Sequence, residues 1–212
     1  GLFMFNQQGI EGAVMQLVNH GITTGALFLC VGIIYERTHR RMIVDHVGLT
    51  IPLPRHATLL VIFALSSLGL PGTNSFVGEF LVLVGTFLWS KLATAIASLG
   101  IVLAAAYLLW MVQRVAFGVP SPHHLPKLKD LDQREMATLV PLVVLIFWIG
   151  LGTLVGLYVG AIPGLSVTMA VSILISFTFS WEVLPALAIM VGIYTGGVYG
   201  GARSGILLNI PG

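Results

Sequence analysis

Long apolar stretches alternate with short polar ones along the whole chain. Each stretch of about 20 or more apolar residues is long enough to cross a bilayer as a helix. The predicted spans are residues 10–35, 57–89, 93–117, 136–162 and 186–210, with a half-length apolar stretch at 165–179. The stretch at 57–89 is too long for one straight crossing, so we expect it to be broken. The pattern predicts an all-α, polytopic integral membrane protein with discontinuous transmembrane helices.

Pro-Gly pairs mark the expected helix breaks. They are Pro71 and Gly72, Pro163 and Gly164, and Pro211 and Gly212. Proline removes a helical hydrogen bond, and irregular backbone inside a membrane is tolerated only where it is buried in protein or lines a water-filled cavity. Discontinuous helices form the binding sites of many transporters, so the breaks favour a transport protein. Kinked helices that only pack well are the alternative.

The composition excludes an ordinary soluble domain. Hydrophobic residues make up 57% of the 212 residues and charged residues only 8%, against about 25% charged in soluble domains. Four of the basic residues lie between residues 36 and 56 and four between 114 and 135, whereas the connection near residue 90 has only Lys91. Basic loops stay in the cytoplasm. We therefore expect a multi-pass protein of the bacterial inner membrane with both long basic loops cytoplasmic.

Two rows of glycine occur in the last third of the chain at four-residue spacing. The first is Gly152, Gly156 and Gly160, and the second is Gly192, Gly196 and Gly200. Small residues at this spacing form a smooth stripe on one face of a membrane helix and let two backbones approach closely. The two helices are therefore expected to pack on each other.

The segment 118–135 is polar and rich in proline, so it is expected to be a cytoplasmic loop. Asp130 and Asp132 near the start of residues 128–135 favour a short interfacial helix there. His123 and His124 have no cysteine nearby, so no metal site is expected. No nucleotide-binding loop or nucleophile triad is present. We expect no catalytic residues, no cofactor and no binding of nucleic acid.

Glu79 is the main candidate for chemistry, because it lies within an apolar stretch directly after the Pro71–Gly72 break. Burial disfavours the charged form of a carboxyl group, so such an acid can take up and release a proton. Ionisable groups inside a membrane are functional by default. We expect the broken helix to leave backbone groups that bind water and lead protons to Glu79. The alternative is a structural acid that caps the broken helix or pairs with a base.

His20 and Arg203 are two further ionisable residues within apolar stretches. His20 lies near the middle of the first span, with Asn19, Thr23 and Thr24 close by. Histidine titrates near neutral pH, so a proton relay is one interpretation, and a buried histidine that only forms hydrogen bonds is the other. Arg203 would either attract an anionic substrate or reach the membrane interface.

Two stretches of the sequence together resemble a known family. "QLVNHGITTGALFLCVGIIYERTHRRMI", followed by "LSSLGLPGTNSFVGEFLVL", is similar to the antiporter-like, proton-pumping subunit M of respiratory complex I, called subunit 4 in mitochondria. The resemblance covers about residues 1–150 and would correspond to the last third of that subunit. Related cation/proton antiporter and membrane hydrogenase subunits share the fold and remain alternatives. A helix-packing or assembly subunit is a third, non-transport interpretation.

The resemblance implies a role for two of these residues. The glutamate of the "GEF" motif, here Glu79, would end the proton path, and the histidine of "NHG", here His20, would belong to the polar axis across the membrane. The chain would be at most a translocating subunit of NADH:quinone oxidoreductase, without a redox site of its own. Its partners would be the lipid bilayer and other membrane subunits of complex I, with quinone and NADH reached only through partner subunits.

The remainder, residues 151–212, resembles a different family. "GTLVGLYVGAIPGLSVTMAV" and "PALAIMVGIYTGGVYGGARSGILLNIPG" are similar to the N-terminal part of the large membrane subunit of tripartite tricarboxylate transporters. That resemblance implies a binding protein and a small membrane subunit as partners. The residues that would shape or line the carboxylate site are Pro163, Gly164, Ser166, Arg203, Asn209, Pro211 and Gly212. Ser166 stands where the family has glycine, which weakens this assignment at that turn.

The two resemblances meet near residue 150, within one predicted span. Neither segment contains all the motifs of its family, and both ends of the chain look cut. We therefore expect two fragments, 1–150 and 151–212, brought together by an artificial or accidental join. A natural fusion is the alternative.

Overall fold

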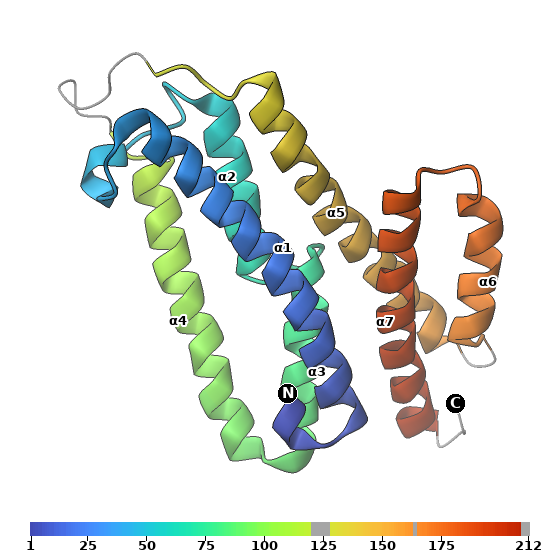
Figure 1. Cartoon of the computed structure of the whole chain (residues 1–212). Helices are drawn as coiled ribbons and strands as arrows, with labels where there is room; N and C mark the ends of the chain where they lie inside the picture. The colour runs from blue at the N-terminus through green and yellow to red at the C-terminus, as the bar shows by residue number, and fades with distance from the viewer. Residues whose placement is uncertain (120–127, 163–164, 209–212) are drawn as a thin grey trace.

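Helices are the only regular secondary structure in the described part of the computed structural model, which is residues 1–119, 128–162 and 165–208, with backbone only at 199 and 202–208. Figure 1 shows their arrangement. In chain order they are the short 3-10 helix η1 (Leu2–Met4), α1 (Gln7–Thr38), the 3-10 helix η2 (Ile43–His46), α2 (Pro54–Ser67), α3 (Asn74–Trp89), α4 (Lys91–Val115), α5 (Gln133–Ala161), α6 (Val167–Thr178) and α7 (Val183–Leu208). The all-α prediction is confirmed.

Three of the described helices are long and apolar enough to cross a membrane. They are α1 with 32 residues, α4 with 25 and α5 with 29. At 1.5 Å per residue, α4 is about 38 Å long, against a hydrocarbon core of about 30 Å. It lies at the edge of the bundle (Figure 1) and exposes large apolar side chains such as Leu103, which is 67% exposed. An apolar surface of this kind suits lipid, in agreement with the predicted polytopic membrane protein.

The chain breaks between α2 and α3, as the Pro-Gly pair predicts. Gly69 follows Leu68, the C-cap of α2, and has a φ of +72°, and the N–H of Leu70 donates to the carbonyl of Leu65 at 3.2 Å. This left-handed residue and its 6→1 hydrogen bond form a Schellman motif, which ends a helix. Pro71 and Gly72 then turn the chain toward α3. Gly69, which the sequence prediction did not single out, is therefore the residue that terminates α2.

The expected short interfacial helix at residues 128–135 is absent, because this segment leads directly into α5. Residues 128–132 are not helical. The Asp132 side chain accepts a hydrogen bond from the Glu135 N–H at 2.8 Å, and the Glu135 side chain accepts one from the Asp132 N–H at 2.9 Å. This capping box fixes the first turn of the long helix at Gln133. The acids near the helix start were recognised correctly, but they belong to α5.

The two glycine rows bring α5 and α7 into backbone contact, as predicted. A Cβ atom added to Gly152 would lie 3.1 Å from the Cα of Gly192, and one added to Gly156 would lie 2.7 Å from the Cα of Ile193. Such separations leave no room for side chains between the helices. Figure 1 shows α7 lying along the second half of α5, whereas the first half of α5 packs with α1 and α2.

Candidate functional site

Glu79 lies on the second turn of α3, beside the break. Its Oε1 accepts a hydrogen bond from Nε2 of Gln16 on α1 at 3.3 Å. Its Oε2 lies against Gly69, where an added Cβ would collide with the carboxyl group. Glycine is thus required at position 69 for two reasons: its φ is positive, and a side chain there would occupy the place of the Glu79 carboxyl group. The break and the carboxyl group form one structural unit.

A buried amide network joins α1 to both sides of the break, directly next to Glu79. Asn74 Nδ2 donates to Asn19 Oδ1 at 3.0 Å, and Asn19 Nδ2 donates to the Asn74 carbonyl at 2.8 Å. The Ser66 hydroxyl donates to Asn74 Oδ1 at 2.8 Å. All three side chains are buried, so the network is satisfied without solvent. It fixes where α3 starts relative to α1 and α2, and thereby where Glu79 stands.

Two buried polar atoms near Glu79 have unused hydrogen-bonding capacity. Within the described residues, Oε1 of Gln16 and Oγ of Ser75 have no hydrogen-bond partner. Ser75 is one helical turn before Glu79 on α3, and Gln16 contacts the carboxyl group directly. An unsatisfied buried polar atom costs about 1–3 kcal/mol, which a bound water relieves. Hydrogen-bonding capacity is therefore left unused close to the carboxyl group of Glu79.

His20 is exposed on α1, one turn after Gln16. The Oγ1 of Thr24 lies 3.2 Å from its Nδ1. Gln16, His20 and Thr24 follow one another at four-residue spacing, so they form a polar row along one side of the helix. Across the described residues no hydrogen bond joins His20 to Glu79. The structure therefore does not bring the two predicted relay residues into contact, and His20 is exposed in this chain.

The other predicted site residues fall into three groups. Pro71 and Gly72 lie in the α2–α3 break. Ser166 is the N-cap of α6, where its Oγ accepts a hydrogen bond from the Met169 N–H at 3.1 Å, and Arg203 belongs to α7 by its backbone. Pro163, Gly164, Asn209, Pro211 and Gly212 lie outside the described residues. Substrate binding at the two later breaks, Pro163–Gly164 and Pro211–Gly212, stays a prediction.

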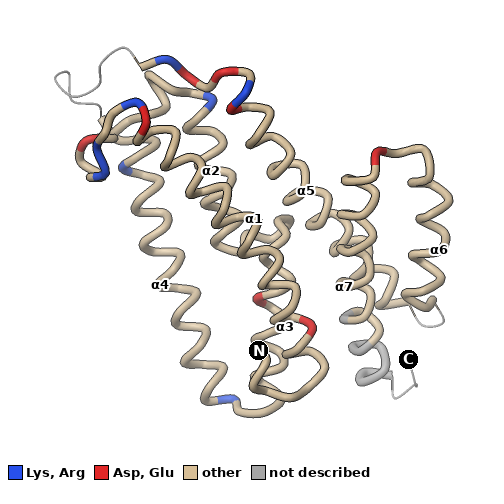
Figure 2. Tube along the Cα trace, viewed as in Figure 1, with Lys and Arg blue, Asp and Glu red and all other residues tan. Residues whose placement is uncertain are grey.

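Most charged residues lie together at one end of the bundle, as Figure 2 shows. We call this the charged end; it contains the C-terminal ends of α1 and α4, the N-terminal ends of α2 and α5, and the segments 39–53 and 128–132. The α3–α4 turn, with Lys91, lies at the opposite end. Both basic stretches of the sequence therefore meet on one side, as alternating spans require.

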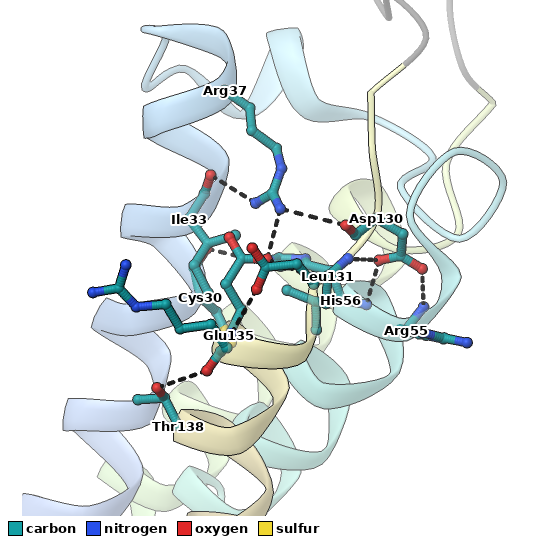
Figure 3. Close-up of polar contacts among 11 residues, drawn as sticks. Cys30, Ile33, Arg37, Arg55, His56, Asp130, Leu131, Glu135 and Thr138 are labelled. Carbon is teal, nitrogen blue, oxygen red and sulfur yellow. Dashed lines mark hydrogen bonds and ion pairs between the residues drawn. The ribbon is translucent and has the colours of Figure 1, made fainter.

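Three helices are tied together at the charged end (Figure 3). Arg37 of α1 forms an ion pair with Glu135 of α5, with 2.7 Å between Nη2 and Oε2. Asp130 accepts hydrogen bonds from the N–H groups of Arg55 and His56 at the start of α2. The His56 ring approaches the Cys30 carbonyl with its Nε2 at 2.9 Å. Arg37 is one of the basic residues between residues 36 and 56, and the sequence pattern did not predict this cluster.

These features define a polytopic helical membrane protein with a carboxyl group held at a broken helix. Residues 1–104 match the family model described as "NADH:quinone oxidoreductase/Mrp antiporter, TM". Residues 146–212 match a second one, described as "Tripartite tricarboxylate transporter TctA family". The resemblance of the chain to both families, predicted from the sequence, is confirmed.

Individual relatives agree with the first family. Over 150 residues the chain is 43% identical to NADH-ubiquinone oxidoreductase chain 4 of Marchantia polymorpha, covering 71% of this chain and 30% of the relative. It is also 43% identical over 150 residues to NADH-quinone oxidoreductase subunit M of Rhodobacter capsulatus, covering 71% of this chain and 29% of that one. The chain thus spans about three tenths of the length of these relatives.

A solved structure shares the fold. A chain in the respiratory complex I from Thermus thermophilus with bound NADH superimposes with a TM-score of 0.64 and 27% sequence identity. The superposition covers 90% of this chain and 34% of that one. Since 90% of 212 residues is about 191, it must extend beyond the 150 residues shared with the sequence relatives. Some of the helices after residue 150 therefore also occupy positions that the complex I fold provides.

Proposed function

We propose that residues 1–150 are a proton-translocating part of a membrane subunit of NADH:quinone oxidoreductase, joined to a fragment of a tricarboxylate transporter permease at residues 151–212. One observation carries the proposal. In a segment similar to subunit M, Glu79 is held beside a broken helix by a hydrogen bond from Gln16. A carboxyl group in a membrane can carry a proton only if its surroundings accommodate both of its forms.

Gln16 suits both protonation states of Glu79. Its amide N–H donates to the ionised carboxylate in the observed arrangement. After protonation, the same side chain turned over can accept the hydrogen bond of the carboxylic acid through Oε1, because an amide is both donor and acceptor. Glu79 thus keeps a partner as it gains and loses a proton, and neither state is left unsatisfied.

Water would reach Glu79 along side chains. The N–H groups of Gly69, Leu70 and Thr73 in the break all donate to nearby carbonyls, so these three donors are not free for water. Ser75 Oγ and Gln16 Oε1 retain free capacity on the same side as the carboxyl group. The break instead supplies the space at Gly69 into which the carboxyl group fits.

His20 continues the path in this proposal. It is one turn from Gln16 on the same side of α1 and is exposed in this chain. The relatives are more than three times as long as the matched segment, so further helices are available in them to cover this face. We propose that His20 exchanges protons with groups on such helices, as the predicted polar axis requires.

The proposed setting follows from the charge distribution. The charged end would face the cytoplasm of a bacterial cell, because basic loops remain on that side. Other membrane subunits of complex I would be the partners, and NADH and quinone would act only through them. The chain itself would contribute proton movement and no electron transfer.

A tricarboxylate permease is the second candidate function, favoured by the family match of residues 146–212. Arg203, Ser166 and Asn209, with the breaks at Pro163–Gly164 and Pro211–Gly212, would then form the carboxylate site. A binding protein and a small membrane subunit would be its partners. Retention of labelled citrate by the purified chain, lost in Arg203→Gln, would favour this function, and no retention would exclude a working site in the fragment.

A transplant tests the first proposal. The matching 150 residues of the Rhodobacter capsulatus subunit M are replaced by residues 1–150, and NADH-driven acidification of inverted membrane vesicles is measured. We expect proton pumping to be retained, because the two segments are 43% identical and Glu79 is present in the segment supplied. An assembled complex that oxidises NADH but pumps no protons would contradict a proton-translocating role for this segment.

A further inference from the structure

A cavity opens at the charged end, away from Glu79. It has a volume of about 270 Å³ and lies between α1, α2 and α4. Its walls are almost entirely apolar and include Leu27, Val31, Leu60 and Met111. Val31 is 55% exposed, so the cavity is accessible from the outer surface of the bundle. An apolar cavity on the lipid-facing side of a membrane protein can take an acyl chain but gives no partner to a polar solute.

The rim of the cavity is positively charged. Arg40 and Arg41 both line it. Arg40 pairs with Asp45 at 3.2 Å, yet its side chain remains 57% exposed. The Arg41 guanidinium lies over the Tyr35 ring, 4.6 Å from the centroid, and no carboxylate of the described residues forms an ion pair with it. Two arginines against one aspartate leave the rim with a net positive charge.

Aromatic residues indicate the depth of this rim in the membrane. Tyr35 lies beneath Arg41, and Trp110 near the end of α4 lies beneath Arg114 with 4.2 Å between guanidinium carbon and ring centroid. Tyrosine and tryptophan gather at the level of the lipid headgroups, and long basic side chains reach the same level. The rim therefore lies at headgroup depth and the apolar walls at the depth of the acyl chains.

We infer that this cavity binds a phospholipid with an anionic headgroup, with the headgroup phosphate on Arg41 and Arg40 and one acyl chain between α1, α2 and α4. Basic pockets between membrane helices on the cytoplasmic side are typical sites for such lipids. A helix of a partner protein is about 10 Å wide and needs a long groove. A free phosphate ion would gain nothing from the apolar walls. The lipid alone matches both the charge of the rim and the character of the cavity.

Native mass spectrometry of the full chain tests this site. The chain is reconstituted into nanodiscs with equal parts of phosphatidylglycerol and phosphatidylcholine that have the same acyl chains, then released into mild detergent. We expect phosphatidylglycerol to be retained in preference. Arg41→Gln should reduce the retention of phosphatidylglycerol about fivefold, because one basic residue near the membrane surface contributes about this factor to the binding of an anionic lipid. Val31→Trp should abolish retention by filling the cavity.

Matched controls separate this site from general lipid contact. Arg134→Gln removes an exposed arginine at the same end of the molecule, and Val102→Trp changes a valine on α4 that is 64% exposed. Both should leave retention unchanged, and far-UV circular dichroism checks that each variant folds. Arg41→Gln changes no core residue, so the test survives if Val31→Trp does not fold.

Each other outcome overturns the inference. Equal retention of the two lipids means that the rim does not select an anionic headgroup. Equal losses in Val31→Trp and Val102→Trp mean that only unspecific surface lipid is counted. If glycerol phosphate alone displaces phosphatidylglycerol, the rim binds a phosphate group and the cavity does not bind an acyl chain. Loss of a dimer mass in Val31→Trp without loss of lipid means that a second copy occupies the cavity.

Discussion

The substitution Gly69→Ala tests the link between the helix break and Glu79. Alanine at a φ of +72° costs about 1–2 kcal/mol, because an L-residue is disfavoured in the left-handed region. The new methyl group would also displace the Glu79 carboxyl group, which an added Cβ at this position would overlap. Displacement breaks the hydrogen bond from Gln16, and a hydrogen bond to a charged group is worth roughly 1.5–3 kcal/mol. The expected total loss of unfolding free energy is thus about 2.5–5 kcal/mol.

A double-mutant cycle separates the two contributions. In a Glu79→Ala background the collision no longer exists, so Gly69→Ala should cost only the backbone strain. The coupling between the two positions should therefore be about 1.5–3 kcal/mol, measured by unfolding the purified chain in mixed micelles with increasing sodium dodecyl sulfate. Gly72→Ala is the control, because Gly72 also has a positive φ of +97° but an added Cβ meets open space there.

Additive effects would refute the reasoning. If the coupling between Gly69 and Glu79 is below about 0.5 kcal/mol, the range found for independent sites, the carboxyl group does not rest on Gly69. The same conclusion follows if Gly72→Ala couples to Glu79→Ala as strongly as Gly69→Ala does.

Three further predictions concern the rest of the fold and use the same unfolding assay. Asn74→Ala should cost about 2–4 kcal/mol, because it leaves buried partners on α1 and α2 without hydrogen bonds; a cost below about 0.5 kcal/mol would contradict a buried network. Gly156→Ala should cost about 1–3 kcal/mol, because it forces α5 and α7 apart. Gly100→Ala is the control: an added Cβ meets open space there, so the change should stabilise α4 by about 0.5–1 kcal/mol. Equal effects of the two substitutions would contradict the close packing of α5 and α7. Glu135→Ala should cost about 1–2 kcal/mol, because it removes both the ion pair with Arg37 and the Glu135 half of the capping box. An unchanged unfolding midpoint would show that these contacts do not stabilise the charged end.

The positions of the helices could be predicted from the sequence because they depend on local signals. A membrane helix needs only an apolar stretch of sufficient length, and the long stretch at 57–89 with its Pro-Gly pair predicted a broken helix. The glycine rows predicted the contact between α5 and α7, since only small residues at four-residue spacing allow it. The error at residues 128–135 is also local, because a capping box starts a long helix as readily as a short one.

The surroundings of Glu79 could be predicted only in part. Glu79 and the break stand close together in the sequence, but its partner Gln16 is 63 residues away. That contact depends on the rotation of α1 about its axis, which the pattern of apolar residues does not define. The same rotation buries Asn19 against Asn74 and leaves His20 exposed, although the two residues are adjacent in the chain. Tertiary packing therefore decided which polar residues of the first span meet Glu79.

Proton pumping by a Glu79→Gln variant of the transplanted subunit tests the central claim most directly. Glutamine keeps the shape of the side chain but cannot carry a proton. The number of protons moved per NADH oxidised should fall sharply, while NADH oxidation by a soluble electron acceptor shows that the complex is assembled. Glu11→Gln, on α1 at a distance from the break, should pump as before. If Glu79→Gln pumps as well as the unaltered transplant, Glu79 is a structural acid and the proposed proton path is wrong.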